Sequence, residues 1–225
     1  MTTVSFRYPG VFALFLVATT RWLGNVLAFS TARENAEDQD DREAMRRVAQ
    51  GDTIALAPLF DRWKLPLISF FYRSLGSQAD AEDLVLKTFE QVWRAAPRYR
   101  HEARFASWLF AIGRNELRHE LRRRKRKPLE PVDPDLLEWT IGSEAVETEH
   151  HTREMEEELL QALQTLPEKQ RSALLLTAAE ELSPAEIAAT LGMSINALYV
   201  TLHRARNALR DIYYPHHENE SQSPS

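Results

Sequence analysis

Residues 105–127 read FASWLFAIGRNELRHELRRRKRK, and this stretch decides how the rest of the chain is interpreted. At helical spacing one side is apolar, while Arg114, Arg118 and Arg122 repeat every fourth residue along another side. Residues 122–127 are six consecutive cations. Such a helix can pack on its own domain with the apolar side and meet phosphates with its arginines, which predicts nucleic-acid binding. The alternative is a solvated surface helix, because clusters of Lys and Arg are a weak pattern.

Composition predicts an all-α protein. The chain has 225 residues, of which 44% are hydrophobic, enough for one large or two small cores, and only 7 are glycine. Long stretches of Ala, Leu, Glu, Arg and Gln favour helix, and no alternating strand pattern of useful length occurs. The absence of cysteine excludes disulfides, cysteine-based zinc sites and a thiol nucleophile, and it fits a cytoplasmic protein.

The formal net charge of −5 is the sum of two blocks of opposite sign. Residues 98–127 contain eleven Lys or Arg and three acids, whereas residues 130–158 contain eleven acids and one Arg. Screening acts over roughly 8 Å at physiological salt, so a partner responds to the nearest block more than to the sum. We therefore expect a basic surface beside an acidic tether.

Residues 1–41 are expected to form a poorly ordered extension that is first apolar and then, over 31–41, an acidic linker. The longest apolar run, residues 11–18, has eight residues and is too short to cross roughly 30 Å of hydrocarbon. A helix that contacts a membrane surface or a partner, or a membrane anchor, is the less favoured interpretation of residues 1–30.

Residues 42–127 form the first predicted domain. Helices are expected over 40–63, where a second helix begins near Asp52, and then over 65–75 and 81–95. Gly76 ends the helix over 65–75, and Asp80 is the expected N-cap of the helix over 81–95. The predicted core residues are Met45, Val48, Ile54, Leu56, Leu59, Phe60, Trp63, Val85, Phe89, Val92 and Ala96. Residues 128–152 contain three prolines and many acids, which indicates a flexible linker whose carboxylates could shield the basic helix.

Residues 153–213 form the second predicted domain, followed by a disordered tail over 214–225. Ser183-Pro184-Ala185-Glu186 has the pattern of a capping box, and Gly192 and Ser194 suit the turn of a helix-turn-helix. The predicted packing seam is Ile187, Ala188, Leu191, Leu198, Leu202, Ala205 and Leu209. In this motif the second helix enters the major groove of DNA. The predicted recognition residues are Ser194, Asn196, Ala197, Tyr199, Val200, Thr201, His203, Arg204 and Arg206.

Residues 80–94, DAEDLVLKTFEQVWR, followed by the basic helix, resemble the second conserved region of bacterial extracytoplasmic-function (ECF) sigma factors, and LPEKQRSALLL at 166–176 resembles the start of the fourth region. The resemblance implies binding to core RNA polymerase and promoter DNA without a cofactor, and leaves an anti-sigma factor open as a further partner. The strand-opening residues that it implies at the minus-ten element are Arg98, Tyr99, Arg100, Trp108, Arg114, Asn115, Arg118 and Arg122. The polymerase-binding residues that it implies are Asp80, Glu82, Asp83, Lys87, Glu90 and Arg94.

The chain departs from the family pattern at three places. Leu86-Lys87 replaces a Gln-Glu pair, and His119 replaces an aspartate within the basic helix. Tyr199 and Thr201 stand where the family usually carries lysine and arginine, which predicts weaker recognition of an upstream promoter element.

Other function classes fit the sequence less completely. A helix-turn-helix regulator that needs no polymerase, tethered to a membrane by residues 1–30, would explain the second domain but not the order of segments upstream. A protein-interaction module would show no dependence on DNA. An enzyme is not expected, because the histidines lack metal-ligand spacing and no glycine-rich phosphate loop occurs, so neither a metal nor a small-molecule substrate is predicted.

Overall fold

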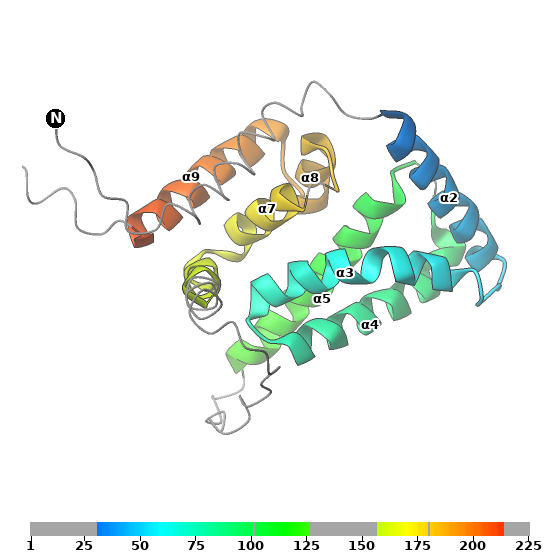
Figure 1. The fold of residues 1–225 in the computed structure, drawn as a ribbon, viewed down its shortest axis with the longest axis horizontal. Helices are drawn as coiled ribbons and strands as arrows, with labels where there is room; N and C mark the ends of the chain where they lie inside the picture. Colours follow the sequence, from blue (N-terminus) through cyan, green and yellow to red (C-terminus); the bar gives the residue numbers. More distant parts are fainter. Residues whose placement is uncertain (1–30, 101, 127–156, 180, 214–225) are drawn as a thin grey trace, which may run out of the picture.

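The structure, a computed structural model, describes residues 31–100, 102–126, 157–179 and 181–213 (Figure 1). The elements in chain order are α2 (Thr31–Ala49), α3 (Leu56–Leu75), α4 (Gln78–Ala95), η1 (Ala96–Arg98), α5 (Phe105–Arg126), α7 (Glu168–Ala178), α8 (Pro184–Leu191) and α9 (Ile195–Tyr213). Residues 157–165 are also helical. The predicted all-α class is confirmed, whereas the predictions for residues 1–30, the linker 128–152 and the tail lie outside the described residues.

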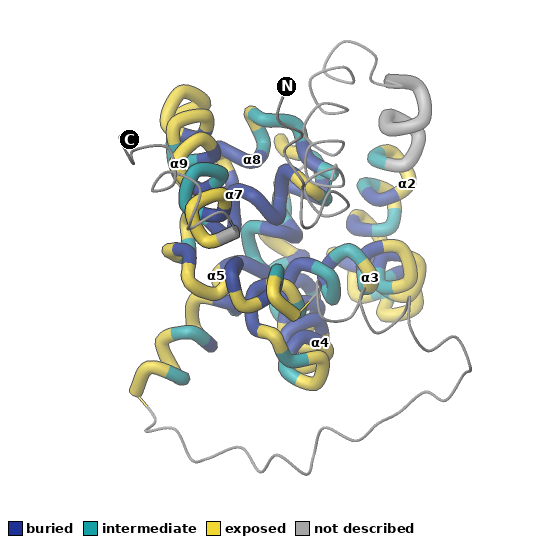
Figure 2. Tube along the Cα trace, turned by 60° about the vertical axis from the view of Figure 1, so that its left-hand side comes forward, coloured by how far each residue is buried: buried dark blue, intermediate teal, exposed yellow. Residues whose placement is uncertain are grey.

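The helices form two groups that touch one another. In the first, α3 packs against α4 and α5, and α2 lies across one end against α3, η1 and α5 (Figures 1 and 2). In the second, α7, α8 and α9 pack together. The groups meet where α7 contacts α3 and where α8 contacts α5.

The close approach of α3 and α5 depends on Gly113. A Cβ at this position would lie 3.1 Å from Phe71 Cζ and 3.4 Å from Leu67 Cδ2. Because these side chains belong to the packed core, a larger residue at 113 would force the two helices apart.

The junction between α3 and α4 is set by Gly76 and Ser77. Gly76 ends α3 in the left-handed conformation with φ +72°, and the amide of Asp80 donates to Ser77 Oγ at 3.3 Å. The predicted N-cap at Asp80 is therefore wrong by three residues. Asp80 lies in the first turn of α4, where its carboxylate accepts from Arg124 Nη2 at 2.6 Å.

Three other local predictions are corrected. Helix α3 continues through residues 63–66, where one helix was expected to end and the next to begin at Leu65, because Trp63, Leu67 and Phe70 form one buried face across Pro66. Helix α2 begins at Thr31, so residues 31–41 are helical instead of forming a linker. Ile54 is 78% exposed and does not join the core, since it lies in the turn between α2 and α3.

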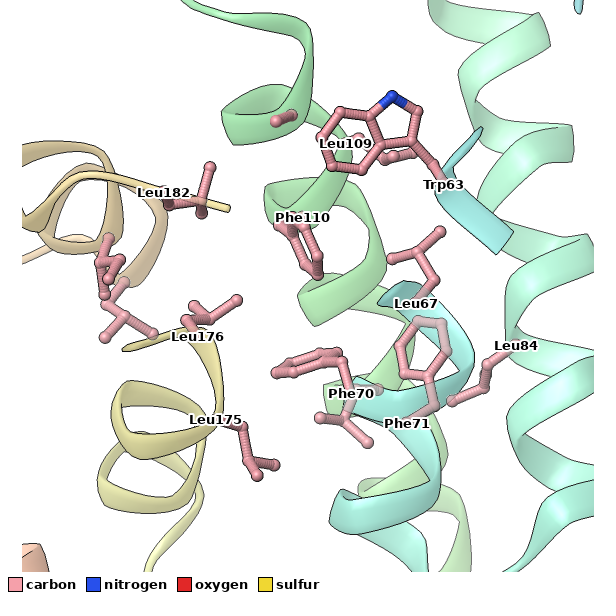
Figure 3. Close-up of a cluster of buried hydrophobic side chains, with 14 of the residues drawn as sticks. Trp63, Leu67, Phe70, Phe71, Leu84, Leu109, Phe110, Leu175, Leu176 and Leu182 are labelled. Carbon is pink, nitrogen blue, oxygen red and sulfur yellow. The ribbon is translucent and has the colours of Figure 1, made fainter. Parts of the chain in front are cut away.

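The buried side chains of both groups form a single hydrophobic cluster. Figure 3 shows the boundary: Phe70 and Phe110 from α3 and α5 face Leu175, Leu176 and Leu182 from the second group. Phe110 is also edge-on to Phe70, with ring centroids 5.9 Å apart. The two predicted domains therefore pack through shared apolar contacts in this conformation.

Among the described helices, none alone is long and apolar enough to cross a membrane. Helices α8 and α9 meet the criterion only as a pair that bends by 88°.

Candidate nucleic-acid interface

Helix α5 exposes to solvent part of the predicted ladder of arginines, which consists of Arg114, Arg118 and Arg122. Arg118 and Arg122 are exposed, and Arg122 Nε donates to the carbonyl of Arg118 at 3.1 Å. Arg123 and Arg124 instead bind Glu120, and the hydrogen bond from Arg123 is the largest cause that holds the pKa of Glu120 below its usual value. Two arginines of the ladder are therefore placed to meet a phosphate backbone.

The first rung of the ladder, Arg114, is not at the surface. Its side chain faces α7 and α8 and is 6% exposed, with Nε 2.9 Å from Glu168 Oε1. The helical spacing correctly separates Arg114 from the apolar side of α5, but the expectation that this side is solvent-facing along its whole length is wrong. Asn115, the next residue, is exposed.

An aromatic pair, Tyr99 from the loop before α5 and Trp108 from the first turn of α5, lies beside two exposed cations. Tyr99 and Trp108 are half-buried with ring centroids 4.6 Å apart, and Tyr99 Oη donates to the carbonyl of Ala103 at 3.3 Å. Burial raises the pKa of Tyr99 from 10.0 to about 12. Arg98, the last residue of η1, and Arg100, in the loop that follows, are exposed. An aromatic surface next to cations is suited to stacking an unpaired base whose phosphates lie nearby.

The helix-turn-helix is formed as predicted. Ser183 and Glu186 complete the capping box, Gly192 takes the left-handed conformation at φ +63°, and the amide of Ala197 donates to Ser194 Oγ at 3.2 Å. The residues of the predicted packing seam are all buried: Ile187, Ala188, Leu191, Leu198, Leu202, Ala205 and Leu209. The second helix of the motif is α9. Because the seam buries one side of α9, the opposite side is its outer side.

Most of the predicted recognition residues lie on that outer side. The exposed ones are Ser194, Asn196, Ala197, Tyr199, Val200, His203 and Arg204. Two are less available: Thr201 is half-buried and donates its hydroxyl to the carbonyl of Ala197 at 2.7 Å, and Arg206 is half-buried with its pKa lowered by burial. The group nevertheless forms a continuous surface along the first turns of α9.

Comparison with known proteins identifies both halves. The Sigma-70 region 2 model matches residues 59–127, and the Sigma-70 region 4 model matches residues 156–209. The RNA polymerase sigma factor CarQ of Myxococcus xanthus is 32% identical over 168 residues, which cover 75% of this chain and 94% of CarQ. This chain belongs to the ECF family of sigma factors.

Two further similarities agree with the family. The ECF sigma factor SigE of Mycolicibacterium smegmatis is 35% identical over 152 residues, which cover 68% of this chain and 59% of SigE. The structure of CnrH in complex with the cytosolic domain of CnrY matches with a TM-score of 0.60 at 26% identity, covering 79% of this chain and 99% of the matched chain. Sigma factors are transcription initiation factors rather than enzymes.

Helix α4 of this sigma factor presents a charged side with an apolar centre. Glu82, Asp83, Lys87, Glu90 and Arg94 are exposed, and Arg94 Nη2 pairs with Glu90 Oε1 at 2.5 Å. Leu86 lies among them and is 60% exposed. Asp80 differs from the rest of the predicted polymerase-binding set because it is half-buried and engaged by Arg124.

The structure makes two further residues prominent. Leu86, already noted as a departure from the family pattern, is apolar but lies off the buried side of α4. Glu168 looks like an ordinary acid in the first turn of α7, and nothing in the sequence pairs it with Arg114. In the part of the chain that the structure describes, no group of three or more acids and histidines is arranged to hold a metal ion.

Proposed function

We propose that this sigma factor binds core RNA polymerase through α4 and directs it to promoters, with α5 and its preceding loop opening the minus-ten element and α9 binding an upstream element. It acts in the cytoplasm, by binding and without a covalent step, and an anti-sigma factor controls its access to polymerase. The observation that carries the proposal is the co-occurrence of an exposed helix-turn-helix surface with exposed arginines and an aromatic pair next to α5.

The energetic demands of strand opening agree with this division of work. Flipping a base out of a duplex costs a few kcal/mol, and stacking it on an aromatic side chain returns about 1–3 kcal/mol. Because these terms nearly cancel, the Tyr99–Trp108 pair cannot open DNA alone, and contacts to phosphates and polymerase must decide the outcome. If about five cations contact phosphates, log affinity should fall with log salt at a slope near −4.5.

Run-off transcription tests the proposal. Core polymerase and purified full-length protein should together produce discrete transcripts from fragments of the source genome, and neither should do so alone. Arg118→Ala plus Arg122→Ala should lower transcript yield strongly. Arg46→Ala plus Arg73→Ala removes the same charge from exposed positions on α2 and α3 and should have little effect. Failure to bind core polymerase, with specific duplex binding by the protein alone, would instead indicate a free-standing helix-turn-helix regulator.

A further inference from the structure

All three guanidinium nitrogens of Arg114 donate hydrogen bonds to the second helix group. Nε and Nη2 donate to the two carboxylate oxygens of Glu168 at 2.9 and 3.2 Å, and Nη1 donates to the carbonyl of Thr190 at 3.3 Å. This fork-to-fork geometry is the one with which arginine also binds two oxygens of a phosphate. While Glu168 occupies the fork, Arg114 cannot hold a phosphate.

Other polar contacts extend along the same side of α5. Thr190 Oγ1 donates to the carbonyl of Ser107 at 3.4 Å. Arg104, just before α5, donates through Nη1 to the carbonyl of Glu181 at 3.4 Å, and the same atom lies 3.6 Å from Glu186 Oε2. The second group thus covers the segment from Arg104, just before α5, to Arg114 within α5.

This interface also contains unfavourable features. A groove of about 560 Å³ lies between the C-terminal part of α5 and the start of α7. One carboxylate, that of Glu168, lines it together with five cations: Arg118, Arg122, Arg124, Lys125 and Arg171. Arg171 is 5% exposed, its Nε has no hydrogen-bond partner among the described residues, and burial lowers its pKa. Like charges around a groove and an unpaired buried donor both favour separation of the two groups.

We propose that Glu168 is an internal competitor for the phosphate partner of Arg114, so that packing of α7 and α8 on α5 is an autoinhibited state of this sigma factor. The proposal rests on the function proposed above. In this state the exposed recognition residues of α9 remain available to duplex DNA, but Arg114 and the covered segment of α5 do not. When the two groups separate on polymerase, a promoter phosphate replaces the carboxylate of Glu168 as the partner of Arg114.

The substitution Glu168→Gln tests the competition while leaving Arg114 intact. The amide keeps the size of the side chain and can still accept from Ser172 Oγ, which lies 3.2 Å from Glu168 Oε1. We expect the free full-length protein to bind a single-stranded minus-ten oligonucleotide about fivefold more tightly or better. Glu158→Gln, at an exposed glutamate of the helical segment 157–165, should change the affinity less than about twofold.

Arg114→Lys provides the background that shows whether the gain passes through the fork. Lysine keeps the charge but cannot make the bidentate pair, so Glu168→Gln should add little to it. An equal gain in both backgrounds, or no gain in either, would overturn the competition. Because loss of one negative charge by itself raises DNA affinity, the gain is counted only where it exceeds that of Glu158→Gln at the same salt concentration.

A reversible crosslink tests the autoinhibited state itself. The native chain has no cysteine, and Lys125→Cys plus Thr165→Cys places two thiols at exposed positions on opposite sides of the groove. We expect a short bis-methanethiosulfonate reagent to link them, to abolish run-off transcription while duplex binding persists, and to release transcription on reduction. The two single-cysteine variants, treated in the same way, serve as controls.

The outcomes separate this proposal from the proposed function. Absence of a crosslink, or equal transcription by linked and reduced protein, would overturn the autoinhibited state while the proposed function stands. Absence of transcription by the untreated native protein would count against the proposed function, whereas crosslinking and the Glu168→Gln effect on oligonucleotide affinity would still report on the interface.

Discussion

Replacing Asp41 by asparagine should make the stability of the protein less dependent on pH between about 4.5 and 6.5. Asp41 is 3% exposed, and its carboxylate accepts from Trp63 Nε1 at 3.0 Å and from Arg62. Burial raises its pKa from 3.8 to about 6, against the opposing effects of Arg62 and Trp63 and with a further increase from Asp38. The contact joins α2 to α3, so it belongs to the structural core of the first helix group.

The sign follows from proton binding. Because the folded carboxyl has the higher pKa, the folded state binds more protons than the unfolded state between pH 3.8 and about 6. The free energy of unfolding therefore falls as pH rises through this window and is flat above it. A pKa moved from 3.8 to about 6 corresponds to about 3 kcal/mol, of which about 2 kcal/mol should appear between pH 4.5 and 6.5.

Urea denaturation at several pH values, followed by circular dichroism, measures this effect. The wild type should lose about 2 kcal/mol of unfolding free energy from pH 4.5 to 6.5 relative to Asp41→Asn, because the amide can still accept from Trp63 but carries no charge. Asp61→Asn, an exposed site on α3, should retain the wild-type profile. If Asp41→Asn and wild type ran parallel across the window, the argument from burial would be refuted.

Three further predictions concern the interface and its support. Trp108→Ala removes the ring that lies 4.6 Å from Tyr99 and should reduce promoter opening by roughly 5- to 150-fold while polymerase affinity changes little; equal losses in both assays would indicate misfolding. Lys87→Glu restores an acid that the family commonly carries on exposed α4 and should preserve or raise polymerase affinity in a pull-down, so a strong loss would contradict that docking surface. Ser183→Ala removes the capping bond to the amide of Glu186 and should lower the free energy of unfolding by about 1 kcal/mol in denaturant titrations, with oligonucleotide affinity unchanged.

The elements that sequence predicted correctly are those whose signals are local. The capping box at Ser183, the left-handed Gly192 and the cap at Ser194 lie within twelve residues, and the helix-turn-helix forms there as expected. The seam of α8 and α9 follows because helical periodicity alone decides which side of a helix is buried. The residues predicted to recognise DNA are mostly the exposed positions of α9 that lie outside this seam.

Local signals were insufficient where two choices were chemically alike. Ser77 and Asp80 are both good N-caps, and the structure uses Ser77 because Asp80 pairs with Arg124, which is distant in sequence. Pro66 is usually read as a helix break, but it lies inside α3 where buried neighbours on one face outweigh the lost backbone hydrogen bond. In both cases tertiary contacts decide between local alternatives.

Arg114 shows why the candidate interface could be predicted only in part. Periodicity placed it correctly on the same side of α5 as Arg118 and Arg122, yet the three differ in surroundings: Arg114 is buried against Glu168, and the other two are exposed. A carboxylate presents the same pair of oxygens to a guanidinium as a phosphate does, so the residue type that suits DNA also suits a protein partner. A pattern of arginines therefore predicts a surface that binds oxyanions, and only the packing of α7 on α5 shows that one of these arginines is already bound.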